Sequence, residues 1–165
     1  MPENHVPQDS SLSEHSLMLE RVFDAPVELI WSLWTDPEHF KAWYGPGGAT
    51  IPVAQMDVRV GGARLVAMEM MTPNGPMKMW FAGEYVEVVE NERLVYTEFM
   101  ADESGVAAPG GHPTTQVVIE LADQGGQTKL TLTHIGIPAD SPGAMGWTMA
   151  LDGLATYVDG LQRAT

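Results

Sequence analysis

The stretch that decides the fold is SPGAMGWTMALDGLATYVDGLQR, residues 141–163. Its apolar residues recur at every third or fourth position, which is the spacing of one face of an α-helix. At about 1.5 Å per residue such a helix would be roughly 30 Å long, enough to cross a small domain. We therefore expect a long amphipathic helix around which the rest of the chain is arranged. Its buried face is predicted to consist of Trp147, Ala150, Leu151, Leu154, Tyr157, Val158 and Leu161.

Three glycines, Gly146, Gly153 and Gly160, lie seven residues apart along one flank of this face. Each of them lowers the stability of a helix by up to about 1 kcal/mol relative to alanine. Close approach of another backbone or of a ligand would account for these glycines. A core helix that simply tolerates three weak positions is the alternative.

The segments before this helix predict one strand, two short helices and then six strands. Helical spacing predicts the short helices at residues 26–35 and 37–44, whereas the strands follow a period of two. The strands are predicted at residues 16–23, 50–60, 63–71, 77–89, 93–100, 114–122 and 128–135. Strands in hairpin order form an antiparallel sheet with helices on one side, which is an α+β fold. A sheet of about seven strands curls, so the long helix would cover its concave face and the short helices would close one end.

The composition limits the class of protein. The 165 residues suit a single domain, predicted at residues 15–165, behind a polar and flexible tail at residues 1–14. A net charge of −14 argues against nucleic-acid and anionic membrane partners, because these need clustered Lys and Arg. The chain has no cysteine, no secretory signal and no apolar run of about 18 residues, so we expect a cytoplasmic protein.

The sequence contains no motif of a metal site or of a covalent nucleophile. The histidines lie in separate segments without the spacing of metal ligands, and both a GxSxG motif and a cysteine are missing. We therefore predict no metal, no cofactor and no assigned catalytic residue. The histidines are His5, His15, His39, His112 and His134.

Three polar residues fall on predicted inward faces of strands. Glu98 shares a face with Tyr96 and Met100, and a buried carboxyl group has a raised pKa unless it is paired. His134 lies at the inward end of the last strand, and Arg64 could pair with a carboxylate. Glu98 and His134 could act as acid and base in a pocket, or all three could be structural groups of the core.

Aromatic and methionine side chains come from every major predicted element. Such side chains line pockets for apolar small molecules, and they also fill protein cores, so both interpretations stay open. The predicted ligand-binding positions combine this set with the three polar residues and the long helix. They are Phe40, Trp43, Arg64, Met68, Met70, Met79, Phe81, Tyr96, Glu98, Met100, His134, Trp147, Ala150 and Leu151.

Five local runs of the sequence resemble the START-like superfamily, also known as SRPBCC or Bet v-like. They are RVFDAPVELIWSLWTDPEHFKAWYGP, Asp57 followed by Gly61-Gly62, FAGEYVEVVENERLVYTEF, TKLTLTH and GWTMALDGLATYV. They occur in this order, and the resemblance covers about residues 16–163. The branch that the chain resembles most is the bacterial Aha-type family, named after the activator of the heat-shock protein 90 ATPase.

The resemblance implies a helix-grip fold with a cavity between the sheet and the C-terminal helix. It favours the binding of a hydrophobic or aromatic small molecule in that cavity. The alternatives are a cyclase- or hydrolase-type enzyme and a co-chaperone-like interaction module in the stress response, because one fold supports many functions. A homodimer and a chaperone partner are further possibilities for this chain.

Overall fold

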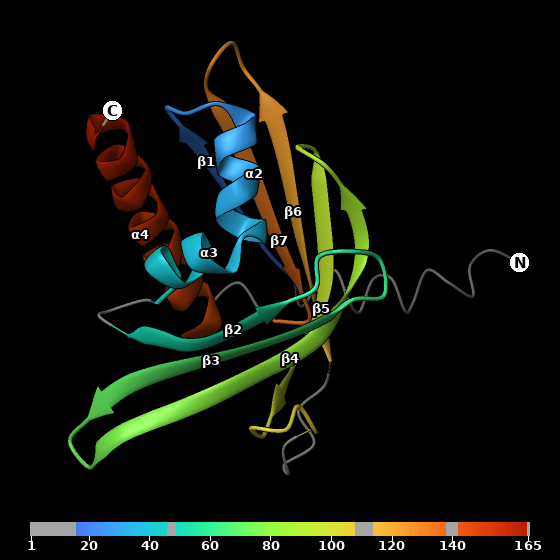
Figure 1. The fold of residues 1–165 in the computed structure, drawn as a ribbon, viewed down its shortest axis with the longest axis vertical. Coiled ribbons are helices and arrows are strands. Elements are labelled where there is room, and N and C mark those ends of the chain that lie inside the picture. The colour runs from blue at the N-terminus through green and yellow to red at the C-terminus, as the bar shows by residue number, and fades with distance from the viewer. Residues whose placement is uncertain (1–15, 46–48, 108–113, 138–141, 165) are drawn as a thin grey trace, which may run out of the picture.

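The computed structural model describes residues 16–45, 49–107, 114–137 and 142–164 (Figure 1). Within these ranges the chain forms seven strands and three helices. The strands are β1 (Ser16–Phe23), β2 (Thr50–Met56), β3 (Ala63–Thr72), β4 (Gly75–Val89), β5 (Arg93–Ala101), β6 (Thr115–Asp123) and β7 (Thr128–Ile135). The helices are α2 (Val27–Thr35), α3 (Pro37–Trp43) and α4 (Pro142–Ala164). The predicted tail and three of the histidines, His5, His15 and His112, lie outside the described residues.

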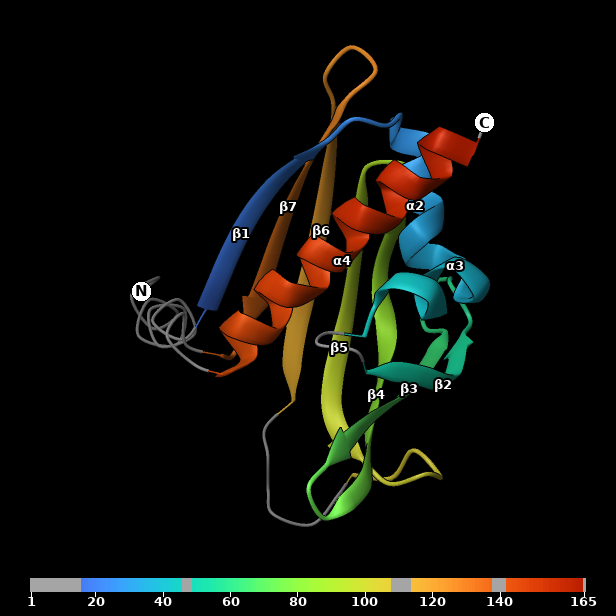
Figure 2. The ribbon, with the colours of Figure 1, turned by 90° about the vertical axis from the view of Figure 1, so that its left-hand side faces the viewer.

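All seven strands belong to one antiparallel sheet with the order β1-β7-β6-β5-β4-β3-β2. The sheet curls, so that β2, β3 and β4 slant across the direction of β6 and β7 (Figure 1). The three helices lie on its concave side (Figure 2). This arrangement confirms the predicted α+β helix-grip architecture, with a curved antiparallel sheet, two short helices and a long C-terminal helix.

Two neighbouring features of β4 accommodate the curl of the sheet. The pairing of β4 with β5 shifts register between Tyr85 and Glu87, and such a β-bulge bends a strand and increases its twist. Gly83 lies just before the bulge, and an ideal Cβ at this position would stand 1.8 Å from the carbonyl oxygen of Thr97. Any side chain here would therefore force β4 and β5 apart.

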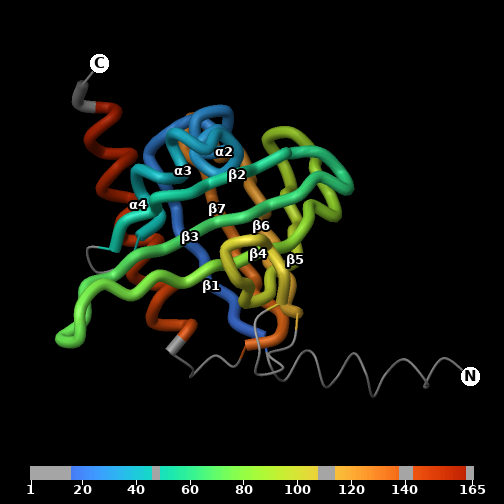
Figure 3. Tube along the Cα trace, turned by 60° about the horizontal axis from the view of Figure 1, so that its bottom comes forward, coloured from blue at the N-terminus to red at the C-terminus, as the bar shows by residue number. Residues whose placement is uncertain are grey.

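The helix α4 runs diagonally across the concave face, while α2 and α3 close one end of the sheet (Figures 2 and 3). Its buried positions are Trp147, Ala150, Leu151, Leu154 and Val158. The residues on its opposite face, among them Thr148, Asp152, Thr156 and Asp159, are exposed. This burial pattern agrees with the predicted apolar face of the helix. None of the described helices is long and apolar enough to cross a membrane.

Two polar contacts fix α4 to the elements on either side of it. On one side, Arg21 of β1 forms an ion pair with Asp152 at 2.9 Å. On the other side, Nδ1 of His39 in α3 and the hydroxyl of Tyr157 are 2.9 Å apart in a hydrogen bond. Both pairs are at least partly accessible to water, so they orient the helix more than they stabilise it.

The structure corrects the predicted boundary of the second strand. The prediction extended this strand over residues 50–60, but β2 ends at Met56. Asp57 then folds into a local turn, because its carbonyl oxygen accepts from the backbone N–H of Arg59 and its carboxylate pairs with the Arg59 side chain. The hairpin between β3 and β4 is tighter than predicted, since only Pro73 and Asn74 lie between the strands.

Two of the predicted helix glycines, Gly153 and Gly160, have different surroundings in α4. An ideal Cβ at Gly153 would lie 3.1 Å from the carbonyl oxygen of Trp43, so here α4 approaches the end of α3 closely. The same atom at Gly160 would meet no heavy atom within 4 Å. Close backbone approach therefore explains Gly153 but not Gly160.

We predict that Gly160→Ala stabilises the protein by up to about 1 kcal/mol, because alanine favours the helix and the added methyl group enters open space. Gly153→Ala should lack this gain, because its methyl group presses on the backbone of α3. Urea unfolding of both variants gives the comparison. Equal gains at the two positions would mean that α3 and α4 are not packed this closely.

Candidate functional site

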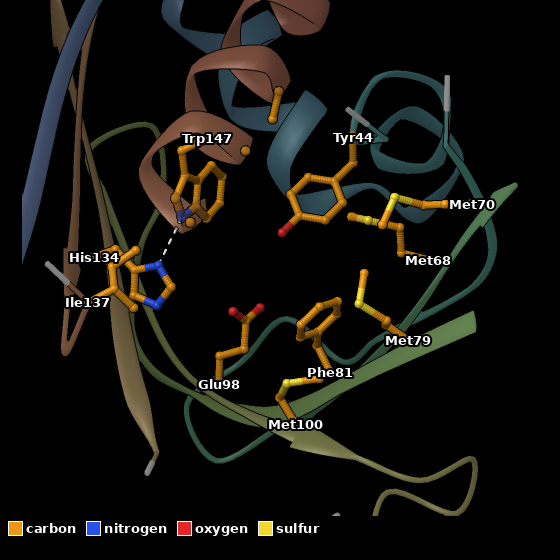
Figure 4. A pocket seen from close by; sticks show the side chains of 13 residues that line it. Tyr44, Met68, Met70, Met79, Phe81, Glu98, Met100, His134, Ile137 and Trp147 are labelled. Carbon is orange, nitrogen blue, oxygen red and sulfur yellow. Dashed lines mark hydrogen bonds between the residues drawn. The ribbon is translucent and has the colours of Figure 1, made fainter. Parts of the chain in front are cut away.

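A cavity of about 520 Å³ lies between the first turns of α4 and strands β3, β4 and β5 (Figure 4). Most of its wall is apolar, and its few polar side chains are Tyr44, Glu98 and His134. The residues that line it are Tyr44, Met68, Met70, Met79, Phe81, Glu98, Met100, His134, Ile137, Gly143, Gly146, Trp147 and Ala150.

The structure separates the fourteen predicted binding positions into two groups. Nine of them line the cavity, namely Met68, Met70, Met79, Phe81, Glu98, Met100, His134, Trp147 and Ala150. The other five are buried behind its wall, namely Phe40, Trp43, Arg64, Tyr96 and Leu151. These five positions support the wall, and a direct contact between them and a ligand remains a prediction.

The methionine side of the cavity follows from the register of three strands. Met68 of β3 pairs directly with Met79 of β4, and Phe81 of β4 pairs with Met100 of β5. Directly paired residues project from the same face of a sheet, so these side chains share the concave face with Met70. Methionine is flexible and polarizable, which lets such a surface adapt to ligands of different shape.

An aromatic cluster forms the opposite wall and joins α4 to α2 and α3. Trp147 of α4 stacks on Trp34 with a distance of 6.1 Å between ring centroids, and it meets the edge of Tyr44 at 5.8 Å. Behind them, Phe40 stacks on Tyr44 at 4.3 Å, and Trp43 packs edge-on against Trp34 at 4.8 Å. Tyr44 and Trp147 thereby have fixed ring planes at the edge of the cavity.

A chain of hydrogen bonds fixes His134 in one protonation state. The indole Nε1–H of Trp147 donates to Nδ1 of His134 at 2.8 Å. The other ring nitrogen, Nε2, therefore carries the proton and donates to Oγ1 of Thr115 at 2.7 Å. The Thr115 hydroxyl in turn donates to the backbone carbonyl of Glu98 at 3.1 Å. Burial lowers the pKa of His134 to about 4, so the ring is neutral at pH 7.

The polar side of the cavity rests on a buried ion pair. Nη1 of Arg64 lies 3.4 Å from Oε2 of Glu98, and the Arg64 side chain is only 1% exposed. Its guanidinium carbon lies 4.0 Å from the ring centroid of Tyr96, a cation–π contact. Burial raises the pKa of Glu98, and the positive charge of Arg64 opposes that shift.

Arg64 and Glu98 come from strands on opposite sides of β4. Arg64 pairs directly with Gly83 across the β3–β4 ladder. Glu98 lies on the far side of β4, between the paired positions Ala82↔Phe99 and Tyr85↔Tyr96. The side chain of Arg64 therefore extends across β4 to reach the carboxylate.

The hydrogen-bonding capacity of this buried cluster is only partly used. Nε and Nη2 of Arg64 and the hydroxyl groups of Tyr85 and Tyr96 have no hydrogen-bond partner in the structure. Burial raises the pKa of Tyr85 and Tyr96, and the positive charge of Arg64 opposes that shift in both phenols. Burial also raises the pKa of Tyr44, so its hydroxyl group stays protonated next to the cavity.

A smaller compartment of about 380 Å³ continues from the cavity past Glu98 and His134. It shares part of its wall with the first compartment and adds Phe99, Thr115 and Gly136. Glu98 and His134 thus lie where the two compartments meet.

Four residues of the wall were not among the predicted positions, namely Tyr44, Ile137, Gly143 and Gly146. Tyr44 lies at the end of the apolar side of the second short helix, so its spacing offered a signal. Gly146 offered another, since it lies on the flank of the apolar stripe and a Cβ there would meet no atom within 4 Å. Ile137 and Gly143 lie next to a turn and a helix start, where no periodicity marks a face.

Within the described ranges, no three His, Asp or Glu side chains are grouped so that they could hold a metal ion. His39, the other described histidine, bonds to Tyr157, which lies ten residues further along α4 than Trp147, the partner of His134.

The curved sheet, the long covering helix and the cavity between them define a START-like helix-grip protein. Solved structures support this class. A protein from Chromobacterium violaceum is 29% identical with a TM-score of 0.74, over 87% of this chain and 97% of the other. A protein from Nitrosomonas europaea is 27% identical with a TM-score of 0.73, over 90% and 96% of the two chains. A protein from Mycobacterium smegmatis is 25% identical with a TM-score of 0.71, over 93% of this chain and 94% of the other.

Within this class the chain belongs to the family of Activator of Hsp90 ATPase homolog 1-like proteins, whose model matches residues 24–159. The match begins just before α2 and ends in the last turns of α4, so it includes every residue of the cavity wall. No functionally curated protein matches the chain.

Trp147 should contribute strongly to stability. We predict that Trp147→Ala costs about 3–5 kcal/mol, because it removes a large buried ring. Trp147→Phe should cost about 1–3 kcal/mol, since it leaves Nδ1 of His134 buried without a donor. Met149→Ala, at an exposed position of the same helix, is the control and should change stability by less than about 0.5 kcal/mol. Denaturant unfolding tests all three, and a Trp147→Ala loss below about 1 kcal/mol would contradict the packing described.

Stability should depend on pH through His134. Its pKa is depressed in the folded state, so its contribution is present above its ordinary pKa of about 6.5 and is lost as the pH falls toward 4. The loss amounts to at most about 3 kcal/mol.

The variant His134→Asn isolates this effect, because asparagine does not titrate but keeps an acceptor near the Trp147 indole. We expect the stability difference between the wild type and the variant to shrink between pH 6.5 and 4, measured by urea unfolding at each pH. Parallel curves would show that His134 takes up no proton on unfolding. Carboxyl groups, including Glu98, are common to both proteins and cancel in the difference.

Proposed function

We propose that this protein binds a hydrophobic or aromatic small molecule in the cavity under the first turns of α4. The observation that carries the proposal is the cavity itself, with a volume of about 520 Å³ and a wall of methionine and aromatic side chains. Ligand sites typically have volumes of about 300–1,000 Å³ and mostly apolar walls with a few placed polar groups. The family's fold is consistent with a ligand-binding domain.

The hydrogen bonds and the lowered pKa of His134 favour ligand binding over acid–base catalysis. Both of its ring nitrogens are engaged, one by Trp147 and the other by Thr115. A general base needs a free ring nitrogen within reach of the substrate, and a pKa of about 4 leaves it a weak base. The enzyme alternative would therefore rest on Glu98 alone.

Apolar ligands should stabilise the protein by mass action. At a concentration 100 times the dissociation constant the gain is about 2.7 kcal/mol, which raises the melting temperature of a domain of this size by roughly 5–10 °C. We expect an environment-sensitive dye to bind the native protein and to be displaced by flat aromatic compounds. Thermal unfolding and dye fluorescence measure the two effects.

The variant Ala150→Phe tests whether the cavity is the binding site. Ala150 lines the cavity, so the phenyl ring should fill the space, block dye binding and leave the fold intact. In a filled core the same change would cost about 1–3 kcal/mol through overpacking. Ala155→Phe, on the exposed side of the same helix, is the matched control and should bind the dye normally. If no apolar compound binds the wild type, the co-chaperone interpretation becomes the better one.

A further inference from the structure

Glu98 offers unused hydrogen-bond acceptors to the cavity. Arg64 is the only side chain of the described residues that hydrogen-bonds its carboxylate, and this contact is long, at 3.4 Å. An ionised carboxylate has about four lone-pair sites on its two oxygens. The Glu98 side chain is 10% exposed and lines both compartments, and in Figure 4 its carboxylate points into the space between Trp147, Tyr44 and Phe81. A ligand that donates a hydrogen bond would satisfy it.

The hydroxyl of Tyr44 is the second polar group available to a ligand. It points into the same space as the Glu98 carboxylate, from the opposite wall (Figure 4). A protonated phenol can donate one hydrogen bond and accept others. Tyr44 and Glu98 together therefore suit a ligand group that both donates and accepts, with the donated hydrogen directed to the carboxylate.

The charge balance beneath the cavity selects against charged ligands. Arg64 is buried and always protonated, and Glu98 is its counter-charge, so the pair is neutral as a whole. A ligand carboxylate would meet the like charge of Glu98. A ligand ammonium would leave water for an apolar wall and add a second cation near Arg64. A hydroxyl group satisfies the same acceptor without bringing a charge into the cavity.

We propose, on the basis of the function proposed above, that the ligand is an uncharged apolar molecule with a hydroxyl group. Its hydroxyl donates to the carboxylate of Glu98 and accepts from the hydroxyl of Tyr44. Its apolar body lies against the methionines of β3, β4 and β5 and the ring of Trp147. The ligand class is thus an apolar alcohol or phenol, and not a fatty acid or an amine.

Four probes of similar size separate these possibilities: naphthalene, 2-naphthol, 2-naphthoate and 2-naphthylmethylammonium. Their dissociation constants at pH 7 come from displacement of the dye. We expect 2-naphthol to bind about tenfold more tightly than naphthalene or better, because a hydrogen bond to a charged acceptor supplies at least that factor. Both charged probes should bind more weakly than naphthalene.

The variant Glu98→Gln should change the affinities for 2-naphthoate and for 2-naphthol in opposite directions. It removes the negative charge but leaves the cation of Arg64, so 2-naphthoate should gain affinity while the preference for 2-naphthol over naphthalene falls to about threefold or less. A purely structural role for Glu98 would weaken all four probes alike.

Tyr44→Phe is the second variant, and it keeps the test valid if Glu98→Gln does not fold. It should lower the preference for 2-naphthol about threefold or more without changing naphthalene binding. Tyr85→Phe is the control, since it removes a buried hydroxyl near Arg64 that does not line the cavity. Its probe preferences should equal those of the wild type.

The possible results distinguish this inference from the function on which it rests. Equal binding of naphthalene and 2-naphthol, or tightest binding of either charged probe by the wild type, would overturn the hydroxyl ligand and leave apolar binding intact. Failure of all four probes and of the dye would overturn the proposed function itself.

Discussion

The hydrogen bond from the Trp147 indole to His134 holds in place the first turns of α4, which cover the cavity. The later turns of α4 pack on the core through Leu154 and Val158, which are almost fully buried. The first turns have a cavity beneath them instead, so fewer side chains can hold them there. A buried, directional bond between α4 and β7 compensates for that missing packing. Thr115 accepts a hydrogen bond from the other nitrogen of the imidazole, so donation runs from Trp147 through His134 to Thr115. A flip of the imidazole ring would break both of its hydrogen bonds.

The ion pair under the cavity is hard to explain by stability. A buried pair with one long contact recovers little of the cost of removing two charges from water, and apolar residues of similar volume are often more stable. A costly ion pair next to a cavity is easier to understand if the carboxylate serves recognition.

The sequence predicted the architecture well because the fold depends on patterns that a sequence displays. The spacing of Trp147, Leu151, Leu154 and Val158 predicted the covering helix, and alternation predicted every strand. The errors lie where a local hydrogen bond outweighs alternation. Val58 and Val60 continue the apolar pattern of β2, yet Asp57 forms a turn with Arg59 and ends the strand at Met56. The turn rests on a backbone hydrogen bond and an ion pair between Asp57 and Arg59, and such local contacts leave no periodic signal in the sequence.

The site was less predictable, because alternation tells which face a side chain takes but not what covers that face. Along β5, Tyr96, Glu98 and Met100 share one face and pass from 1% exposed to 8% to half-buried. Along β3, Arg64 and Met70 show the same change from core to cavity.

The helices determine where on each strand the core ends. The aromatic residues of α3 belong to the core and fill the space over one part of the concave face. The close approach of Gly153 to Trp43 determines how near α4 lies to α3. Beyond the contact between α4 and α3, strands β3, β4 and β5 continue, and the space between them and the first turns of α4 is the cavity. The cavity is therefore a consequence of helix placement, and its polar residues are those that the strands present at its border.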